Sequence, residues 1–254
     1  MSVDWSPLDA ELERLEAPLP VWWRDDDAVA ETPGLDRLTG LAADHGWPLH
    51  LAIIPAGADA TLARRLNDAP GVVPVVHGWA HANHAPEGRK KAEFGAHRSL
   101  EDMAAQAGVA RDRLTALLGQ PPAPMFVPPW NRIAPDLLPL LPAQGFAMIS
   151  TFTPRTDPMA APGLTRVNTH LDPIDWRGSR SLVAPDRLIA QFAADLADRR
   201  EGRADAAEPY GLLTHHLVHD AAIWRFTADL LTRLSRARIV HWDARADHPP
   251  EPNP

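Results

Sequence analysis

The chain has 254 residues, of which 45% are hydrophobic, and a formal net charge of −8. This length is enough for one sizeable core. The acidic balance argues against a nucleic-acid-binding protein, which usually has a basic face, and against attachment to an anionic membrane surface. The lack of cysteine excludes a disulfide framework, a zinc ribbon and a thiol nucleophile.

The first twenty residues carry acidic side chains throughout and contain no apolar stretch typical of a secretory signal. No part of the chain approaches the roughly 18 uninterrupted apolar residues of a membrane span. We therefore expect a cytoplasmic protein with neither a membrane nor a nucleic acid as its partner.

Helix and strand patterns alternate along the whole chain. In chain order they predict a helix over 5–17, a strand over 19–23, a helix over 34–45, a strand over 48–55, a helix over 58–67, a strand over 72–76, a helix over 99–118, a strand over 125–127, a helix over 135–144, strands over 146–151 and 164–170, a helix over 185–199, a strand over 210–214, a helix over 223–235 and a strand over 239–242.

This alternation favours an α/β fold with a mainly parallel sheet covered by helices. Seven or eight strand–helix units fit a (β/α) barrel better than an open sheet. We expect one domain over residues 1–247, with a polar loop over 82–98 and a disordered tail over 248–254.

Three consecutive carboxylates, Asp25, Asp26 and Asp27, follow the first expected strand. Carboxylates at the end of a buried strand repel one another and lose hydration, so they need a cation or a catalytic role. The alternative is an acidic turn that caps the next helix.

A pair of histidines, His77 and His81, follows the strand expected over 72–76. Two histidines four residues apart can face one cation, and imidazole with carboxylate is a ligand set for zinc, iron, cobalt or nickel. Such a pair is weak evidence alone, but the acidic triplet one or two strands away strengthens it.

Further polar groups follow later strands. Pro128 and Pro129 fix the backbone and leave the amides of Trp130 and Asn131 to face a ligand, which suits oxyanion binding. The last two clusters are His170-Leu-Asp-Pro-Ile-Asp175-Trp176 and Leu212-Leu-Thr-His215-His216. A histidine beside a buried carboxylate can work as a general acid.

The order of these motifs resembles the NodB-homology polysaccharide deacetylases, a family of metal-dependent carbohydrate esterases. The matching segments are Arg24-Asp25-Asp26-Asp27, His77-Gly-Trp-Ala-His81, Val127-Pro-Pro-Trp130, Asp172-Pro-Ile-Asp175-Trp176 and Leu213-Thr-His215. The resemblance covers roughly residues 20–240. It implies a distorted (β/α) barrel, usually of seven parallel strands, and one divalent metal, commonly zinc, with cobalt, nickel or iron as alternatives.

The resemblance implies hydrolysis of an N-acetyl or related amide on an amino sugar, an oligosaccharide or a similar compound. Asp26, His77 and His81 are the expected metal ligands, and Asp25 is the expected base. This register places Asp26 nearest the usual distance before Thr32-Pro33, and a shift by one to Asp26 and Asp27 is the alternative.

The expected oxyanion donor is the Trp130 amide, and the expected acid is His215, oriented by Asp175. His216 is the alternative acid. Val127 stands where the family has an arginine that steadies the base, so Arg132 or Arg24 is expected to replace it. Because that arginine is missing, a catalytically weak sugar-binding relative is the second hypothesis.

Overall fold

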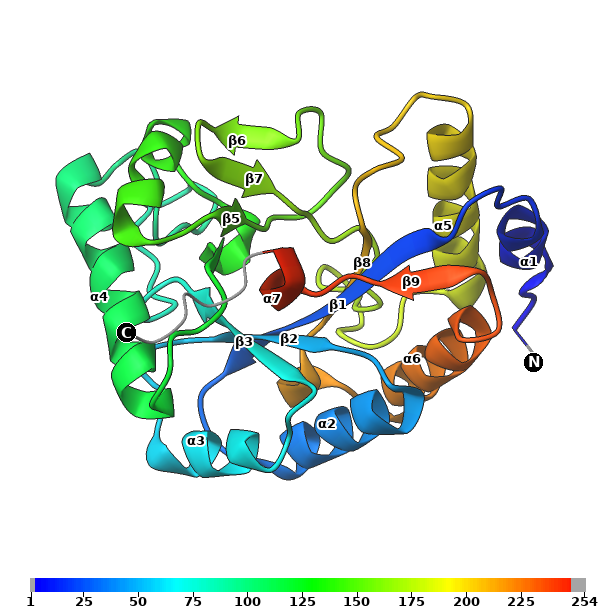
Figure 1. Ribbon diagram of the computed structural model, residues 1–254, viewed down its shortest axis with the longest axis horizontal. Coiled ribbons are helices and arrows are strands. Elements are labelled where there is room, and N and C mark those ends of the chain that lie inside the picture. The colour runs from blue at the N-terminus through cyan, green and yellow to red at the C-terminus, as the bar shows by residue number, and fades with distance from the viewer. Residues whose placement is uncertain (1–2, 248–254) are drawn as a thin grey trace.

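A mainly parallel sheet runs through the centre of the molecule, with helices around it (Figure 1). The structure is a computed structural model that describes residues 3–247, so the tail expected over 248–254 lies outside the described residues. The strands are β1 (Leu19–Ala28), β2 (Leu49–Ile53), β3 (Val72–His77), β4 (Met125–Val127), β5 (Met148–Ile149), β6 (Met159–Ala161), β7 (Leu164–Arg166), β8 (Tyr210–Thr214) and β9 (Ile239–His241).

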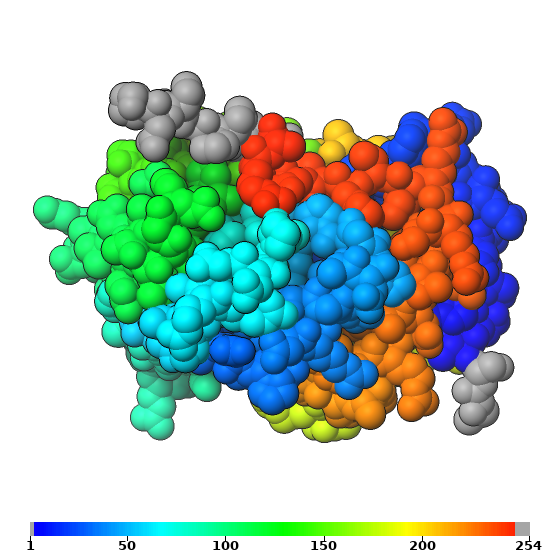
Figure 2. Space-filling model, turned by 60° about the horizontal axis from the view of Figure 1, so that its bottom comes forward, coloured from blue at the N-terminus to red at the C-terminus, as the bar shows by residue number. Residues whose placement is uncertain are grey.

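Helices follow most of these strands. The α-helices are α1 (Ser6–Glu13), α2 (Pro33–His45), α3 (Ala60–Asn67), α4 (Leu100–Leu118), α5 (Pro185–Arg200), α6 (Ala221–Leu234) and α7 (Ala244–Asp247), and the 3₁₀ helices are η1 (Pro129–Asn131), η2 (Pro135–Leu140), η3 (Pro142–Gln144) and η4 (His216–Val218). Figure 2 shows α2 (blue), α3 (cyan) and α6 (orange) covering one side of the molecule. Within residues 3–247, no helix is long and apolar enough to cross a membrane.

The strand order is β6-β7-β5-β4-β3-β2-β1-β8, and β9 also pairs with β1. All pairs are parallel except β6 with β7. The α/β class and the parallel sheet are therefore confirmed, with seven parallel strands from β7 to β8 along the path. The sheet is open rather than a closed barrel.

The opening lies between β7 and β8. Residues 167–171, which follow β7, partly span it. The Val167 N–H donates to the Ile149 carbonyl, and the His170 N–H donates to the Gly211 carbonyl. Because β5 and β7 are only two and three residues long, they have few backbone groups with which to continue the pairing.

Successive residues of β1 face opposite sides of the sheet. Val21 and Trp23 belong to the large core between the sheet and the helices, whereas Trp22 belongs to a smaller core on the inner face. Val73 and Val75 on β3 share that inner face. Both faces of β1 are thus buried, which is typical of a central parallel strand.

Local sequence signals explain most helix boundaries. The Thr32 side chain accepts a hydrogen bond from the Leu35 N–H at the start of α2, and Gly46 ends that helix in the left-handed conformation. The helix expected over 135–144 is wrong in type, because η2 and η3 are short 3₁₀ helices. Pro135, Pro139 and Pro142 lack the N–H that an α-helix needs.

Candidate active site

The polar clusters of the sequence meet at the carboxyl ends of the parallel strands. Asp25, Asp26 and Asp27 lie within the C-terminal end of strand β1 rather than after it. His77 is the last residue of β3. His215 follows β8 directly. Ligand sites in open parallel sheets occur at this edge.

The three aspartates point in different directions. Asp25 is fully buried and accepts hydrogen bonds from the Thr214 hydroxyl at 2.6 Å and from the His216 backbone N–H at 3.0 Å. Its Oδ1 also accepts from His216 Nδ1 at 2.5 Å. Burial alone would raise the pKa of Asp25, but His216 and Thr214 lower it below its ordinary value. Asp25 therefore joins β1 to the β8 end.

Asp27 is the carboxylate that the structure brings to the two histidines. Its Oδ1 lies 3.1 Å from His77 Nε2 and 3.4 Å from His81 Nε2. One ligand atom from each of these three residues lies within 4.8 Å of the others, as a shared metal ion requires. The structure therefore groups Asp27, rather than the expected Asp26, with His77 and His81, in agreement with the alternative register.

The backbone explains this change of register. Alternation along β1 places Trp22, Arg24 and Asp26 on the inner face and Asp25 on the helix-facing side. Asp27 would also face the helices in a regular strand, but the pairing with β2 shifts between Asp25 and Ala28, and Asp27 has φ 77°. This bulge turns Asp27 back towards the site.

Hydrogen bonding prepares His77 to be a ligand. Its Nδ1 donates to the Val127 carbonyl at 3.0 Å, which leaves Nε2 directed at Asp27. Burial alone would lower the pKa of His77, but the carboxylates of Asp26 and Asp27 raise it above its ordinary value. Burial would raise the pKa of Asp27, but His77, His215 and His81 hold it well below its usual range.

Asp26 is buried and pairs with Arg24, two residues earlier on the same face of β1. Arg24 Nε lies 2.9 Å from Asp26 Oδ1, and Arg24 Nη2 donates to Oδ2 at 3.1 Å. Arg24 also donates to Asn131 Oδ1 at 2.8 Å and to the Ser150 hydroxyl at 2.7 Å. Asp26 Oδ1 accepts no hydrogen bond from any described residue. Apart from its ion pair with Arg24 Nε, this oxygen can therefore still accept a hydrogen bond or a proton.

Of the two arginines expected to replace the one missing at Val127, Arg24 contacts an aspartate of the site and Arg132 does not. Arg132 Nη1 instead donates to the Lys91 carbonyl at 2.8 Å near the surface. Proximity in sequence to the Pro128-Pro129 turn suggested Arg132. The inward face that Arg24 shares with Asp26 could be recognised only once the strand alternation was known.

His215 lies on the other side of Asp26, with Nε2 4.0 Å from Asp26 Oδ2. The edge of Trp176 contacts the His215 ring at a centroid distance of 4.7 Å, and Trp176 Nε1 donates to Asp172 Oδ2 at 2.7 Å. Burial raises the pKa of Asp172, while the charge of His215 opposes that rise. Asp172 thus reaches His215 through Trp176, while the carboxylate that forms an ion pair with His215 is Asp26.

Asp175 does not face His215 as expected. It lies at the surface and accepts hydrogen bonds from the Gly178 and Ser179 N–H groups of its own turn, at 3.0 and 3.1 Å. His216 is likewise directed away from the position expected of an acid, because its Nδ1 donates to Asp25. The pattern Asp-x-x-Asp contains both carboxylates, and only the fold distinguishes them.

The turn after β4 brings Trp130 against the histidines. The Trp130 ring lies 4.2 Å from the His81 ring by centroids. The Asn131 N–H donates to the Pro128 carbonyl at 2.9 Å, so the Trp130 amide alone stays a candidate oxyanion donor. Asp27, His81, Trp130 and Asn131 all have positive φ. Such strain often gathers at functional sites.

Glu93 is a buried residue of this region that the sequence reasoning missed. Its carboxylate accepts hydrogen bonds from the backbone N–H groups of Trp79 at 3.0 Å, Ala80 at 2.8 Å and Ala82 at 3.3 Å. A Cβ on Gly78, which has φ 56°, would lie 2.4 Å from Glu93 Oε2. A lone glutamate in a polar loop gave no signal of this role.

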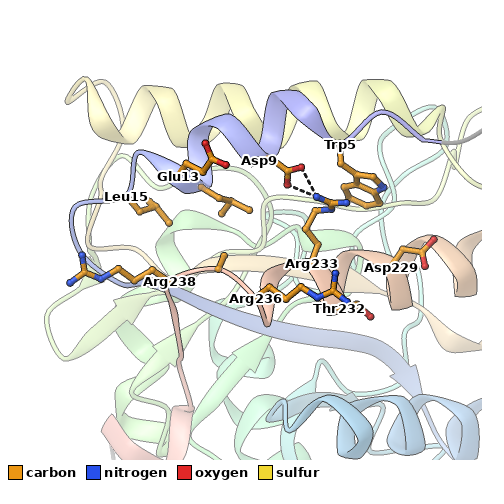
Figure 3. Close-up of a pocket in the computed structure, with 11 residues that line it drawn as sticks. Trp5, Asp9, Glu13, Leu15, Asp229, Thr232, Arg233, Arg236 and Arg238 are labelled. Carbon is orange, nitrogen blue, oxygen red and sulfur yellow. Dashed lines mark hydrogen bonds and ion pairs between the residues drawn. The ribbon is translucent and has the colours of Figure 1, made fainter.

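A cavity of about 660 Å³ lies elsewhere, between α1 and the end of α6 (Figure 3). Trp5, Asp9, Arg233, Arg236 and Arg238 are among its lining residues, and Asp9 pairs with Arg233 across it. None of the polar residues at the strand ends lines this cavity. The cavity is therefore separate from the candidate site at the strand ends.

Comparison with solved structures shows that the fold is shared with carbohydrate esterases of family 4. No family model and no curated protein matches the sequence. A protein of Mycobacterium smegmatis assigned as a polysaccharide deacetylase has a TM-score of 0.63 and 15% identity, over 87% of this chain and 86% of that one.

Two further structures have the same fold. A family 4 carbohydrate esterase from Streptomyces lividans, in complex with acetate, has a TM-score of 0.52 and 17% identity, over 89% of this chain and 100% of that one. A mutant of a CE4-family pseudoenzyme with restored activity has a TM-score of 0.54 and 15% identity, over 85% of this chain and 62% of that one. At these identities the likeness establishes the fold that the motifs implied.

Proposed function

We propose that the chain is a metal-dependent hydrolase that removes an N-acetyl or related acyl group from an amino sugar, an oligosaccharide or a similar amide. The observation that carries this proposal is the grouping of Asp27, His77 and His81 beside Asp26 and His215. The fold shared with deacetylases and carbohydrate esterases supports the same reaction class.

The donor set fits a divalent cation. Asp27 offers a carboxylate, and His77 offers an Nε2 whose tautomer is set by the bond from Nδ1 to the Val127 carbonyl. His81 completes the set, which suits zinc first and also cobalt, nickel or iron. When bound, such a cation supplies a Lewis acid that polarises the acyl oxygen and lowers the pKa of a water molecule.

Asp26 is the proposed base. Arg24 holds its carboxylate through two nitrogens, while Asn131 and Ser150 fix the guanidinium in turn. Asp26 Oδ1, which contacts Arg24 Nε as an ion pair but accepts no hydrogen bond from residues 3–247, takes the proton from the attacking water. Arg24 thereby supplies the contact that the family pattern assigns to the position of Val127.

His215 is the proposed acid. The oxygen of water adds to the acyl carbon, the carbon–nitrogen bond breaks, and His215 gives a proton to the leaving amine. The Trp130 amide is the proposed donor to the oxyanion. The Trp176 ring, which donates a hydrogen bond to Asp172, packs edge-on against the His215 ring.

The second hypothesis is a sugar-binding relative without turnover, which rests on Val127. A pseudoenzyme has this fold, so the fold also occurs in a protein without turnover. The pairing of Arg24 with Asp26 favours the enzyme, because it restores support to a carboxylate in the position of the base.

Acetate release from a panel of acetylated amino sugars tests the proposal. We expect turnover by the metal-loaded protein and a loss of about 10²–10⁴-fold in Asp26→Asn, with the metal retained. Asp175→Asn removes a surface carboxylate of the same motif region and should keep its activity. No turnover of any panel member by the metal-loaded protein would favour the sugar-binding relative.

A further inference from the structure

Cations without carboxylate partners flank the candidate active site. Lys91 and Arg132 lie on one side of it and Arg180 on the other, and none of them forms an ion pair with a carboxylate anywhere in residues 3–247. This protein has 33 acidic and 25 basic side chains, so acidic partners are plentiful. The charges of these three cations are therefore not neutralised by an ion pair and can act on a ligand.

Within residues 3–247, eight of the 23 arginines pair with a carboxylate. Arg65 contacts Asp36, Arg155 contacts Asp205 and Arg203 contacts Asp198, at 2.5, 2.8 and 2.5 Å. Charges gathered without counter-ions beside a site raise the local concentration of ligands of the opposite sign.

Lys91 and Arg132 are held next to the proposed metal ligands. Arg132 donates to the Lys91 carbonyl at 2.8 Å, which joins the 82–98 loop to the turn after β4. Lys91 Nζ lies 6.0 Å from the centroid of the Trp130 ring, and that ring contacts His81. The two cations and the indole thus form one wall of the site.

A second wall has the same composition. Arg180 lies 5.2 Å from the centroid of Trp176, and Trp176 contacts His215. Both indoles are partly exposed. Each wall therefore combines an aromatic surface, on which a sugar ring can pack, with a cation beside it.

We infer that the substrate carries an anionic group, a carboxylate or a phosphate, which pairs with Lys91 and Arg132 while its sugar ring packs against Trp130. The inference rests on the proposed function, because it takes the acyl group to lie at Asp27, His77 and His81. It adds the charge class of the substrate to that function.

The expected preference is moderate and depends on salt. Exposed ion pairs are weak, so each cation should contribute about a twofold to fivefold gain in affinity. Ionic strength near 0.3 M should reduce that gain strongly, because exposed charges are screened over a few ångströms to about 10 Å.

Binding of three sugars to the zinc-loaded full chain tests this, with affinities from ligand-observed NMR titration at low and high salt. N-acetylglucosamine is the neutral probe, N-acetylglucosamine 6-phosphate carries a phosphate, and N-acetylmuramic acid carries a carboxylate. We expect at least one acidic sugar to bind severalfold more tightly than the neutral one, and the acid that gains identifies the source of the anion.

Variants separate pairing with these cations from direct binding of the anion to the metal. Lys91→Gln with Arg132→Gln should remove the preference and leave the affinity for N-acetylglucosamine unchanged. Arg236→Gln, which removes one positive charge at the distant cavity of Figure 3, should leave the preference intact. All three positions are exposed or partly exposed, so these variants should fold.

Each outcome is decisive. Equal affinity for neutral and acidic sugars, no binding of either acidic sugar, or a preference that survives the loss of both cations overturns the inference. A cation-dependent preference without acetate release from any sugar supports the inference and contradicts the proposed function. Acetate release without a preference for acidic sugars supports the proposed function and contradicts the inference.

Discussion

Asp25 and Asp26 are neighbours in the chain but belong to opposite faces of β1, and this decides their roles. Asp25 joins β1 to the β8 end through Thr214 and His216. Asp26 faces inward with Arg24. A carboxylate enclosed by hydrogen-bond partners on the helix side serves structure, whereas one with an oxygen that accepts no hydrogen bond at the strand edge can accept a proton.

We therefore expect Asp25→Asn to destabilise the fold by about 3 kcal/mol, because it leaves the buried His216 without its counter-charge. Urea unfolding of the metal-free protein measures this loss. Asp175→Asn, at the surface, is the matched control with little expected effect. Full stability of Asp25→Asn together with loss of hydrolysis would return the role of base to Asp25.

The sequence predicted that these residues act together but not which residue does what. Val21, Trp22 and Trp23 are all apolar, so the strand has no polar face from which to read its alternation. The bulge at Asp27 then reverses the direction in which this side chain points, and no residue nearby in the sequence predicts that bulge. The sequence also did not show which carboxylate of this motif, Asp172 or Asp175, lies near His215, because both follow the same strand-like segment.

At the scale of elements, the loop between β3 and α4 determines the geometry of the proposed metal site. The Glu93 carboxylate accepts hydrogen bonds from three backbone N–H groups of the segment that carries His81. Gly78 permits this approach, because its φ is positive and a side chain there would collide with Glu93 and Pro129. Glu93 is thus a positioning residue for His81.

We expect Glu93→Gln to lower zinc affinity by about tenfold, the order seen when groups that orient a metal ligand are lost. Competition with a chromophoric chelator measures the affinity. Glu87→Gln removes an exposed carboxylate from the same loop and should have no effect. Equal affinity of Glu93→Gln and the parent protein would mean that the loop holds His81 without this carboxylate.

Element positions followed the sequence closely wherever one pattern dominated. The helices expected over 34–45 and 99–118 match α2 and α4 within one residue, because caps and glycines mark their ends. The short antiparallel β6 was missed, since three residues are too few for a periodic pattern. Prolines converted the expected helix over 135–144 into 3₁₀ turns.

At the scale of the whole molecule, buried histidines make stability depend on pH. His50 Nδ1 donates to the Trp23 carbonyl at 3.1 Å, and Nε2 accepts from the Ala244 N–H at 3.1 Å, so the ring is neutral and joins β1 and β2 to α7. Burial lowers the pKa of His50 from 6.5 to about 4.

Between pH 6.5 and about 4 the unfolded chain binds a proton at His50 that the folded chain does not. Stability should therefore fall as the pH falls through this window, by roughly 3 kcal/mol from this group. His50→Gln, whose amide can make both hydrogen bonds, should flatten the pH profile of the unfolding free energy. Exposed His84→Gln should not, and an unchanged profile in His50→Gln would contradict this account.

Alternation of strands and helices was enough to predict a parallel α/β sheet, but not that the sheet stays open. Closure depends on whether β7 and β8 pair directly, and the Val167–Leu171 segment contacts both sides with only a few backbone bonds. Such long-range pairing has no local signal in the sequence.

The central claim is that Asp27, and not Asp26, holds a divalent metal with His77 and His81. The metal content of purified variants tests it most directly. We predict about one metal ion per chain in the parent protein and in Asp26→Ala, and almost none in Asp27→Ala or in His77→Ala with His81→Ala. Full metal content in Asp27→Ala, with its loss in Asp26→Ala, would contradict the account.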